Sequence, residues 1–255
     1  MIRFALLGSG SRGNATLVEC GRTRVLVDCG FSVRELERRL SAIQVDPATI
    51  DAILVTHEHG DHIRGVWPFA RRHGLPVWMT PGTAIACELR PGDDFHPVVP
   101  EEPFAVGDLH VTPFAVPHDA REPCQYRFDD GDRMLGMLTD TGSLTPHIRD
   151  MLGGCHGLIL ECNHDPDLLA VGPYPPSLKR RVGGDYGHLS NGQAAELLAD
   201  IATGRLQRLV GAHLSEKNNT PAHAARALAE ALGCRPEEME IATQDTPSNW
   251  FSLSS

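Results

Sequence analysis

The chain has 255 residues, of which 41% are hydrophobic and 22% are charged, and its formal net charge is −10. These values are ordinary for a globular protein, and no apolar run is long enough to cross a bilayer, so a disordered chain and a membrane span are excluded. The acidity argues against binding nucleic acid through a broad basic surface. Any such contact must depend on a local basic patch or on bound cations.

The location of the protein is predicted from its first residues and its cysteines. Residues 1–8 lack a basic leader followed by a long apolar segment and a cleavage site, so they predict a first strand rather than a signal peptide. The seven cysteines are an odd number and include no Cys-x-x-Cys pair. Free thiols in a reducing compartment suit this pattern. We therefore expect a cytoplasmic protein that makes no contact with membranes.

Strands and helices alternate along the chain. Period-two apolar patterns predict strands at 4–7, 15–20 and 23–28, and a capping box at Ser32 predicts a helix that runs to Ile43. Further strands are predicted at 52–56, 77–80, 109–116, 125–128, 134–139, 158–161 and 209–213, and further helices at 63–73, 144–152, 190–202 and 221–232. No repeat or linker divides the chain, so residues 1–255 are predicted to form one domain, with 163–187 as its one extended irregular segment.

The segment His57-Glu58-His59-Gly60-Asp61-His62 carries the strongest chemical signal. Alternate residues of an extended segment point the same way, so His57 and His59 can bind one ion while Asp61 and His62 face a second. A site for two metals needs further ligands, preferably from strand ends. Three more metal-ligand residues each follow a predicted strand, namely His118, Asp140 and His213. Imidazole and carboxylate together suit zinc, manganese or iron.

These residues, in this order, resemble the metal-binding motifs of the metallo-β-lactamase superfamily, and the resemblance covers nearly the whole chain. It implies an α/β (α+β) protein with a four-layer αβ/βα sandwich and an active site at the strand ends between two sheets. Asp28 resembles a family carboxylate that supports the metal loop from behind. The implied ligand sets are His57, His59 and His118 for one ion, Asp61, His62 and His213 for the other, and Asp140 as the bridge between them.

Segments outside the ligand set narrow the resemblance to one branch of the superfamily. They are 8–15, 118–120, 161–165, 172–175, 178–181, 187–191 and 213–215. Together they are similar to the YycJ/WalJ branch, whose members are described as DNA exonucleases. The tRNA 3′-processing endonucleases (RNase Z) share part of the pattern, including Glu161 and His188, but the protruding tRNA-binding arm of that family is lacking here.

The resemblance implies a hydrolase that cleaves phosphodiester bonds, with DNA ends as the expected substrate and with Asp61, Glu161 and His188 in catalysis. Two divalent ions would lower the pKa of a water held between them and would neutralise charge on the phosphoryl oxygens. The leaving alkoxide then needs a proton. His188, oriented by Glu161, is the candidate donor.

Other activities of the same fold are alternatives. A small-molecule cyclic phosphodiesterase suits an acidic protein, and the phosphoribosyl cyclic phosphate hydrolases look like close cousins. Thioester or β-lactam hydrolysis agrees less well with Asp140 and with the Glu161 and His188 pair. A regulatory or scaffold role without catalysis disagrees with the complete ligand set.

Several residues outside the ligand set have two open interpretations. The run Lys179-Arg180-Arg181 forms either a solvated helix face or a patch that binds substrate phosphate. His164 either contacts substrate or makes local hydrogen bonds. Ser11 and Asn14, in the Gly-rich first turn, either line a phosphate pocket or belong to a tight strand connection.

Overall fold

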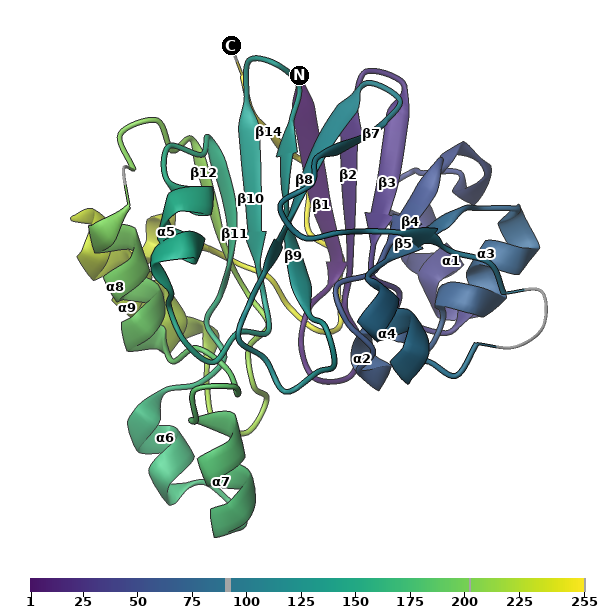
Figure 1. Cartoon of the computed structure of the whole chain (residues 1–255). Coiled ribbons are helices and arrows are strands. Elements are labelled where there is room, and N and C mark those ends of the chain that lie inside the picture. Colours follow the sequence, from purple (N-terminus) through teal and green to yellow (C-terminus); the bar gives the residue numbers. More distant parts are fainter. Residues whose placement is uncertain (90–92, 202, 255) are drawn as a thin grey trace.

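Two seven-stranded sheets form the body of the protein in the computed structural model, which describes residues 1–89, 93–201 and 203–254 (Figure 1). The first sheet has the strand order β14 (Phe251–Ser252), β1 (Ile2–Gly8), β2 (Ala15–Cys20), β3 (Thr23–Val27), β4 (Ala52–Leu54), β5 (Val77–Met79) and β6 (His96–Pro97). The second has the order β13 (Glu240–Ile241), β12 (Arg208–Ala212), β11 (Gly157–Glu161), β10 (Met134–Leu138), β9 (Cys124–Asp129), β8 (Leu109–Ala115) and β7 (Phe104–Val106).

Each sheet combines antiparallel and parallel pairs. Strands β1 to β3 are antiparallel neighbours, and β3 to β6 continue as parallel neighbours. The second sheet repeats this plan, with β7 to β10 antiparallel and β10 to β13 parallel. Parallel strands end at the same edge of a sheet, so side chains that follow β3, β4, β10, β11 and β12 are brought to shared edges.

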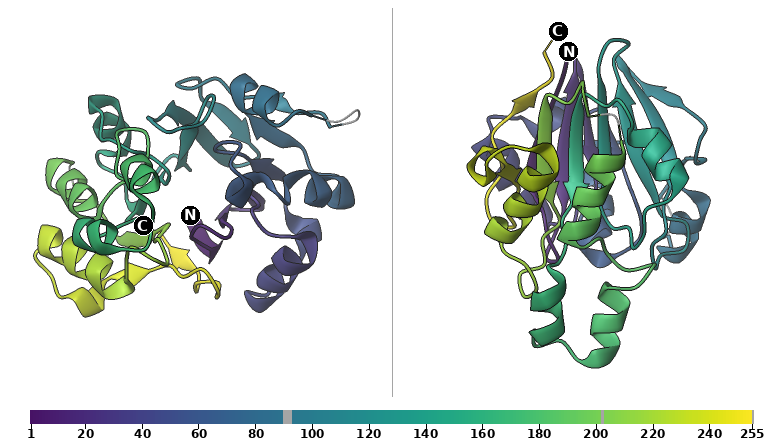
Figure 2. Two further views of the ribbon diagram at one scale, coloured as in Figure 1. Left: turned by 90° about the horizontal axis from the view of Figure 1, so that it is seen from below. Right: turned by 90° about the vertical axis from the view of Figure 1, so that its left-hand side faces the viewer.

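Alternate residues of the strands divide between an inner core and two outer cores. Phe4 of β1 and Phe128 of β9 belong to the core between the sheets, whereas Leu7 and Leu158 face the outer cores. Helices α1 (Val33–Ala42), α3 (Val66–His73) and α4 (Pro81–Ala86) supply the outer core of the first sheet, and α5 (Pro146–Leu152), α8 (Asn191–Asp200) and α9 (Pro221–Leu232) that of the second (Figures 1 and 2). The predicted four-layer αβ/βα sandwich is confirmed.

The two sheets are hydrogen-bonded to each other just before the histidine-rich loop. The hydroxyl of Tyr126, which is fully buried, donates to the carbonyl of Val55 at 2.7 Å. The backbone N–H of Cys124 donates to the carbonyl of Thr56 at 3.0 Å. These bonds fix the end of β4 against the second sheet, so the loop that begins at His57 lies between both sheets.

The helix predicted at 63–73 is α3, which begins later, at Val66, and a separate short helix, α2 (Gly60–Ile63), precedes it, with Gly65 at the junction. The N–H of Gly65 donates to the carbonyl of Cys29 at 2.7 Å. A Cβ on Gly65 would lie 1.9 Å from the carbonyl oxygen of Phe31 and 2.6 Å from the Sγ of Cys29. This close approach requires glycine, and α3 begins at the next residue, Val66.

The segment 163–187, predicted to be irregular, contains two helices, α6 (Pro166–Val171) and α7 (Pro176–Val182). They form a hairpin that projects beyond the ends of both sheets (Figures 1 and 2). The side chain of Asp165 caps α6 by accepting from the N–H groups of Asp167 and Leu168, each at 3.0 Å. An Asp-Pro pair is a typical helix start, so the signal for α6 was present in the sequence.

The remaining differences concern element ends and short elements. Helix α8 is capped by Ser190 and ends at Asp200, and Ala202, the predicted end, lies outside the described residues. The sequence patterns missed α4, β6, β7, β13 and β14 and the 3-10 turns η1 (Pro47–Thr49) and η2 (Pro236–Glu238). Within the described parts of the chain, every helix is too short or too polar to span a membrane.

Candidate metal centre

The ends of several strands bring metal-ligand side chains to one place. Asp28 follows β3, His57 follows β4 by three residues, Asp140 lies two residues beyond β10, and His213 follows β12 directly. Asp28, Asp140 and His213 have positive φ angles of 61°, 52° and 54°. Residues other than glycine seldom adopt this left-handed conformation, and such strained positions cluster at functional sites.

All seven predicted ligand residues are brought together. Their ligand atoms form three overlapping groups in which all atoms lie within 4.8 Å of one another. These groups are His57, His59 and His118; Asp61, His62 and His213; and His57, His62 and Asp140. The first two groups match the two ligand sets implied by the resemblance, and Asp140 lies near both. We refer to these seven residues as the metal cluster.

The metal cluster contains buried polar atoms that the rest of the described chain does not satisfy. The Nε2 atoms of His57 and His213 and the Oδ2 atom of Asp140 are buried and make no hydrogen bond to any described residue. His62 Nε2 lies 3.2 Å from Asp140 Oδ2, but the two atoms are not aligned for a hydrogen bond. Unsatisfied buried groups are costly, and atoms that converge without bonding one another suit a shared cation. The cluster therefore fits divalent metal ions.

The pKa shifts of His57 and His118 favour the neutral form that binds a metal. Burial lowers the pKa of His57 well below its usual range, and the neighbouring His62 ring lowers it further. Burial also lowers the pKa of His118. Neutral imidazole is the form that binds a metal. Burial alone would lower the pKa of His62 too, but the carboxylates of Asp140 and Asp28 raise it well above its usual range, and a bound cation would replace that proton in balancing their charge.

Asp28 supports the histidine-rich loop from within the protein. One carboxylate oxygen accepts from the N–H of Thr56, and the other accepts from the Thr56 hydroxyl and from Nδ1 of His62, with all three distances at 2.8 Å. Because Nδ1 of His62 is held by Asp28, Nε2 is the ring nitrogen that faces the cluster. This is the placement expected for Asp28, and partners of this kind orient metal ligands.

His213 is held by two residues on opposite sides. Its backbone N–H donates to the hydroxyl oxygen of Ser9 at 2.7 Å, and its carbonyl accepts from Nδ2 of Asn163 at 2.9 Å. Asn14 also lies against the cluster, with its Nδ2 at 3.1 Å from His62 Nε2 and 3.3 Å from Asp61 Oδ2. The Gly-rich first turn therefore contacts the cluster from the interior.

Glu161 and His188 form a hydrogen-bonded pair beside the cluster. Nδ1 of His188 donates to Oε1 of Glu161 at 2.7 Å, and Oε2 of Glu161 accepts from the N–H groups of Thr141 and Leu189 at 3.0 and 3.2 Å. Burial by itself would raise the pKa of Glu161, but the His188 ring and hydrogen bonds from His188 and His213 lower it to about 2. Both carboxylate oxygens of Glu161 already accept hydrogen bonds from protein groups. Glu161 is therefore better suited to orienting His188 than to binding an ion, although Glu161 and His188 also lie near Asp140 and His213.

A pocket of about 350 Å³ opens over the cluster. Pockets that bind small ligands have volumes of roughly 300–1,000 Å³. Its lining residues are Ser11, His59, Gly60, Asp61, Asp119, Asp140, Tyr174, Leu178, Arg181, Val182, Gly187, His188 and His213. We call it the catalytic pocket. Three carboxylates and a single guanidinium line it, so bound cations are needed before it can attract a phosphate.

Of the basic residues predicted to contact substrate, one lines this pocket and two do not. Arg181 lines it and forms an ion pair with Asp119. The Nζ of Lys179 instead donates to the carbonyl of Ala170 at 2.6 Å and so ties α7 to α6. Arg180 is exposed and outside the pocket lining. The three side chains differ because successive residues of a helix point in different directions.

The other three predicted contacts also differ from one another. Ser11 lines the catalytic pocket. Asn14 does not, because its side chain is turned inward to Asp61 and His62. His164 is buried beside α7, outside the pocket lining, and its Nδ1 makes no hydrogen bond to the described residues. Its backbone carbonyl accepts from the N–H of Asn191 at 2.8 Å, and a substrate contact of His164 stays a prediction.

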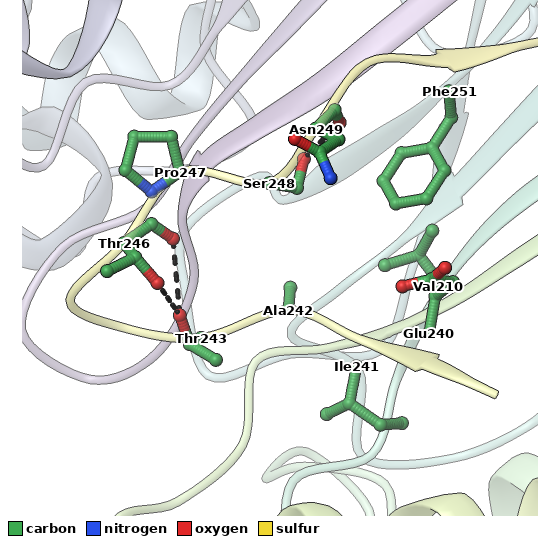
Figure 3. Close-up of a pocket in the computed structure, with 10 residues that line it drawn as sticks. All are labelled: Val210, Glu240, Ile241, Ala242, Thr243, Thr246, Pro247, Ser248, Asn249 and Phe251. Atoms are coloured by element: carbon green, nitrogen blue, oxygen red, sulfur yellow. Dashed lines mark hydrogen bonds between the residues drawn. The ribbon is translucent and has the colours of Figure 1, made fainter. Parts of the chain in front are cut away.

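A second pocket, of about 240 Å³, lies beside the edge strand β13 and the segment that leads to β14 (Figure 3). Its lining is Val210, Glu240, Ile241, Ala242, Thr243, Thr246, Pro247, Ser248, Asn249 and Phe251. Glu240 is its one charged residue, and no histidine lines it. A single carboxylate cannot support metal-dependent hydrolysis, so the candidate active site is the catalytic pocket.

Sequence patterns missed several residues of the catalytic pocket. Asp119 directly follows His118, and its Oδ1 lies 3.5 Å from His118 Nε2 and 3.6 Å from His59 Nε2. Tyr174 and Leu178 come from the hairpin. Their segments contribute to the family resemblance, but a lone tyrosine or leucine carries no chemical signature that predicts a pocket wall.

Comparisons with known proteins agree with this geometry. The family model for the beta-lactamase superfamily domain matches residues 23–213. The chain is 36% identical to exodeoxyribonuclease YycJ of Bacillus anthracis, over 91% of this chain and 89% of that protein. It is 35% identical to exodeoxyribonuclease WalJ of Streptococcus pneumoniae, over 85% of this chain and 83% of that protein.

The fold itself is shared with solved structures. The crystal structure of the metallo-beta-lactamase fold protein YhfI from Bacillus subtilis aligns with a TM-score of 0.75 and 17% identity, covering 97% of this chain and 98% of that one. At this identity the likeness shows the fold alone. The family match and the two relatives go further, and the chain belongs to the beta-lactamase superfamily, in the branch that contains YycJ and WalJ.

Proposed function

We propose that this protein is a metal-dependent phosphodiesterase that removes nucleotides from the ends of DNA. The observation that carries the proposal is the lining of the catalytic pocket, which includes four residues of the metal cluster (His59, Asp61, Asp140 and His213), His188 with Glu161 bonded behind it, and the guanidinium of Arg181. These groups can activate water, donate a proton and bind a phosphate. Hydrolysis of a phosphodiester needs all three functions.

Two divalent ions, zinc or manganese or iron, are the proposed cofactors. His57, His59 and His118 would hold one ion, Asp61, His62 and His213 the other, and Asp140 would lie between them. When bound, such ions lower the pKa of water and offset charge on phosphoryl oxygens. The buried, unpaired atoms of His57, Asp140 and His213 support this assignment.

His188 is the proposed proton donor. Its Nδ1 is bound to Glu161, which leaves Nε2 as the ring atom that can protonate a leaving oxygen in the catalytic pocket. The Glu161 carboxylate is held in turn by two backbone N–H groups. Such a fixed carboxylate keeps the imidazole oriented.

The two relatives named exodeoxyribonucleases support nucleic acid, and DNA in particular, as the substrate. The pocket volume of about 350 Å³ is enough for a group of nucleotide size. A cytoplasmic location is supported by the seven cysteines, which form no disulfide.

A second candidate is hydrolysis of a small cyclic phosphodiester. The net charge of −10 and the presence of Arg181 as the one Lys or Arg in the pocket lining favour a small substrate over a long polyanion. The pocket chemistry serves both substrates equally well. The two candidate functions are distinguished by whether the protein cleaves DNA or a small cyclic phosphodiester.

The test is a cleavage assay on protein reconstituted with Mn²⁺ or with Zn²⁺. End-labelled duplex DNA, single-stranded DNA, RNA and a cyclic ribose phosphate are compared at equal phosphodiester concentration. We expect progressive release of mononucleotides from DNA. Hydrolysis of the cyclic ribose phosphate alone would favour the second candidate, and cleavage of RNA alone would keep the phosphodiesterase but replace DNA as its substrate.

A further inference from the structure

The hairpin of α6 and α7 forms one wall of the catalytic pocket. Tyr174 lies in the turn before α7, and Leu178 and Arg181 lie three residues apart on α7, so they share a helix face. The hairpin itself projects beyond the ends of both sheets (Figures 1 and 2). The side chains of this wall therefore lie outside the sandwich but next to the metal cluster.

The two walls of the pocket differ in chemistry. The wall from the strand ends is polar and consists largely of histidine and aspartate. The hairpin wall supplies an aromatic ring, two aliphatic side chains and one guanidinium, from Tyr174, Leu178, Val182 and Arg181. A nucleotide has the same division, since its phosphate is charged and its base has a flat apolar face.

We propose that Tyr174, Leu178 and Arg181 form a subsite for the terminal nucleotide of a nucleic-acid strand. The base stacks on Tyr174 against Leu178, and Arg181 binds a phosphate of that nucleotide. This inference rests on the proposed function and identifies the hairpin as the element that recognises the end of a strand. Stacking on an aromatic side chain tolerates every base, so the subsite accepts any sequence.

Arg181 is positioned for this role by Asp119. Its Nε donates to the Asp119 carboxylate, while its two terminal nitrogens make no hydrogen bond to the described residues. A guanidinium has five donors in a planar fork, so the free side of Arg181 can bind a phosphate through two of them. Asp119 also lies 3.5 Å from His118 Nε2. Asp119 is thus a positioning residue that keeps the guanidinium beside the metal cluster.

Tyr174 has the exposure that a stacking residue needs. It is half-buried, and its hydroxyl makes no hydrogen bond to any residue that the structure describes. Tyr186, which follows α7, is 65% exposed and does not line the pocket. The chain therefore offers two tyrosines in one segment, of which one faces the pocket, and Tyr186 serves as the matched control.

The hairpin is anchored to the residues that would bind metal. Nδ1 of His118 donates to the carbonyl of Gly187 at 2.9 Å, and the Ser143 hydroxyl donates to the carbonyl of Asp185 at 3.0 Å. The segment that follows α7 is thereby fixed relative to the cluster. A nucleotide held by Tyr174 and Arg181 would have its phosphodiester at a constant distance from the reacting groups.

The experiment measures nucleotide binding to manganese-reconstituted protein by calorimetry. The probes are deoxyadenosine 5′- and 3′-monophosphate, each compared with the deoxyribose phosphate that lacks the base. Tyr174→Ala should weaken binding of the nucleotide by about 5- to 150-fold, the range of one base stack, and leave the sugar phosphate unchanged. Tyr174→Phe keeps the ring and should retain the affinity. Tyr186→Ala should change neither.

Arg181→Ala should weaken the nucleotide and the sugar phosphate alike, whereas Arg180→Ala should change neither. If Asp119 acts through Arg181, Asp119→Asn should weaken binding in the wild-type background and have no further effect once Arg181 is alanine. A residue that only maintained the fold would weaken binding in both backgrounds. Metal content and thermal unfolding of each variant are measured in parallel.

Equal losses of nucleotide and sugar phosphate in Tyr174→Ala, or an equal loss in Tyr186→Ala, would overturn the stacking subsite. The absence of base-dependent binding in the wild type would do the same. The proposed function fails separately, when the protein cleaves no DNA. Base-dependent binding that requires Tyr174 would still support the subsite in that case, as a site for free nucleotides.

Discussion

His188 is the residue whose role can be separated most clearly from metal binding. Its bond to Glu161 leaves one ring nitrogen for catalysis, and the ligand groups of the metal cluster are complete without it. His188→Ala should therefore retain its metals. A general acid contributes typically 10²- to 10⁴-fold when the leaving group is poor, so activity on a nucleotide diester should fall by about that factor.

Comparison of leaving groups tests this role. A nitrophenolate departs without a proton, so His188→Ala should lose much less activity on an aryl phosphodiester than on DNA, and Glu161→Gln should show a weaker form of the same selectivity. Equal losses on both substrates with metals retained would point to phosphate binding instead. Loss of metal from His188→Ala would make His188 a ligand.

At the scale of single elements, the junction of α2 and α3 positions Asp61 and His62. Gly65 packs so closely on Cys29 and Phe31 that a methyl group has no room. Gly65→Ala should lower the free energy of unfolding by about 1–3 kcal/mol, the usual cost of overpacking, and should weaken metal binding because α2 moves with the junction. Urea unfolding and a metal titration measure the two effects.

Gly192 provides the control for that substitution. It lies in the first turn of α8, where the nearest atom to a new Cβ, apart from its neighbours, is the Ser190 hydroxyl oxygen at 3.8 Å. Gly192→Ala should leave stability unchanged or slightly raised, because alanine favours a helix. A Gly65→Ala protein as stable as Gly192→Ala would show that the junction tolerates movement.

The sequence predicts those features of the fold and of the site that depend on short local patterns. The histidine-rich loop combines rare residue types at short spacing, and each remaining cluster ligand follows a recognisable strand, so all seven residues could be named before the fold was known. The break at Gly65 and the roles of Asp119 and Tyr174 depend on contacts between segments far apart in the chain. The periodicity of apolar residues along the sequence gives no information about such contacts. The prediction that the chain is one domain stays a prediction.

At the scale of the whole molecule, an acidic protein should bind DNA through few phosphate contacts. The net charge is −10, and Arg181 is the one Lys or Arg that lines the catalytic pocket. The dependence of KM for single-stranded DNA on salt should be shallow. Arg181→Ala should flatten the slope of log KM against log salt by about 0.7, the value for one phosphate contact on a single strand.

The neighbouring basic residues are the controls for the salt experiment. Lys179 is bonded to the carbonyl of Ala170, and Arg180 lies outside the pocket lining, so alanine at either position should leave the slope unchanged. A slope that responds equally to all three substitutions would indicate a diffuse basic surface on α7. Unchanged slopes in all three would favour the small cyclic substrate.

The central claim is that two metal ions in the cluster support cleavage of DNA ends. The most direct measurement is a titration of metal-free protein with Mn²⁺, following bound metal and the release of mononucleotides from end-labelled DNA in the same samples. We predict that activity rises with the second equivalent and that Asp140→Asn, which removes a negative charge between the two proposed ion positions, binds both ions less tightly. Full activity at one equivalent, or no DNA cleavage at two, would contradict the account.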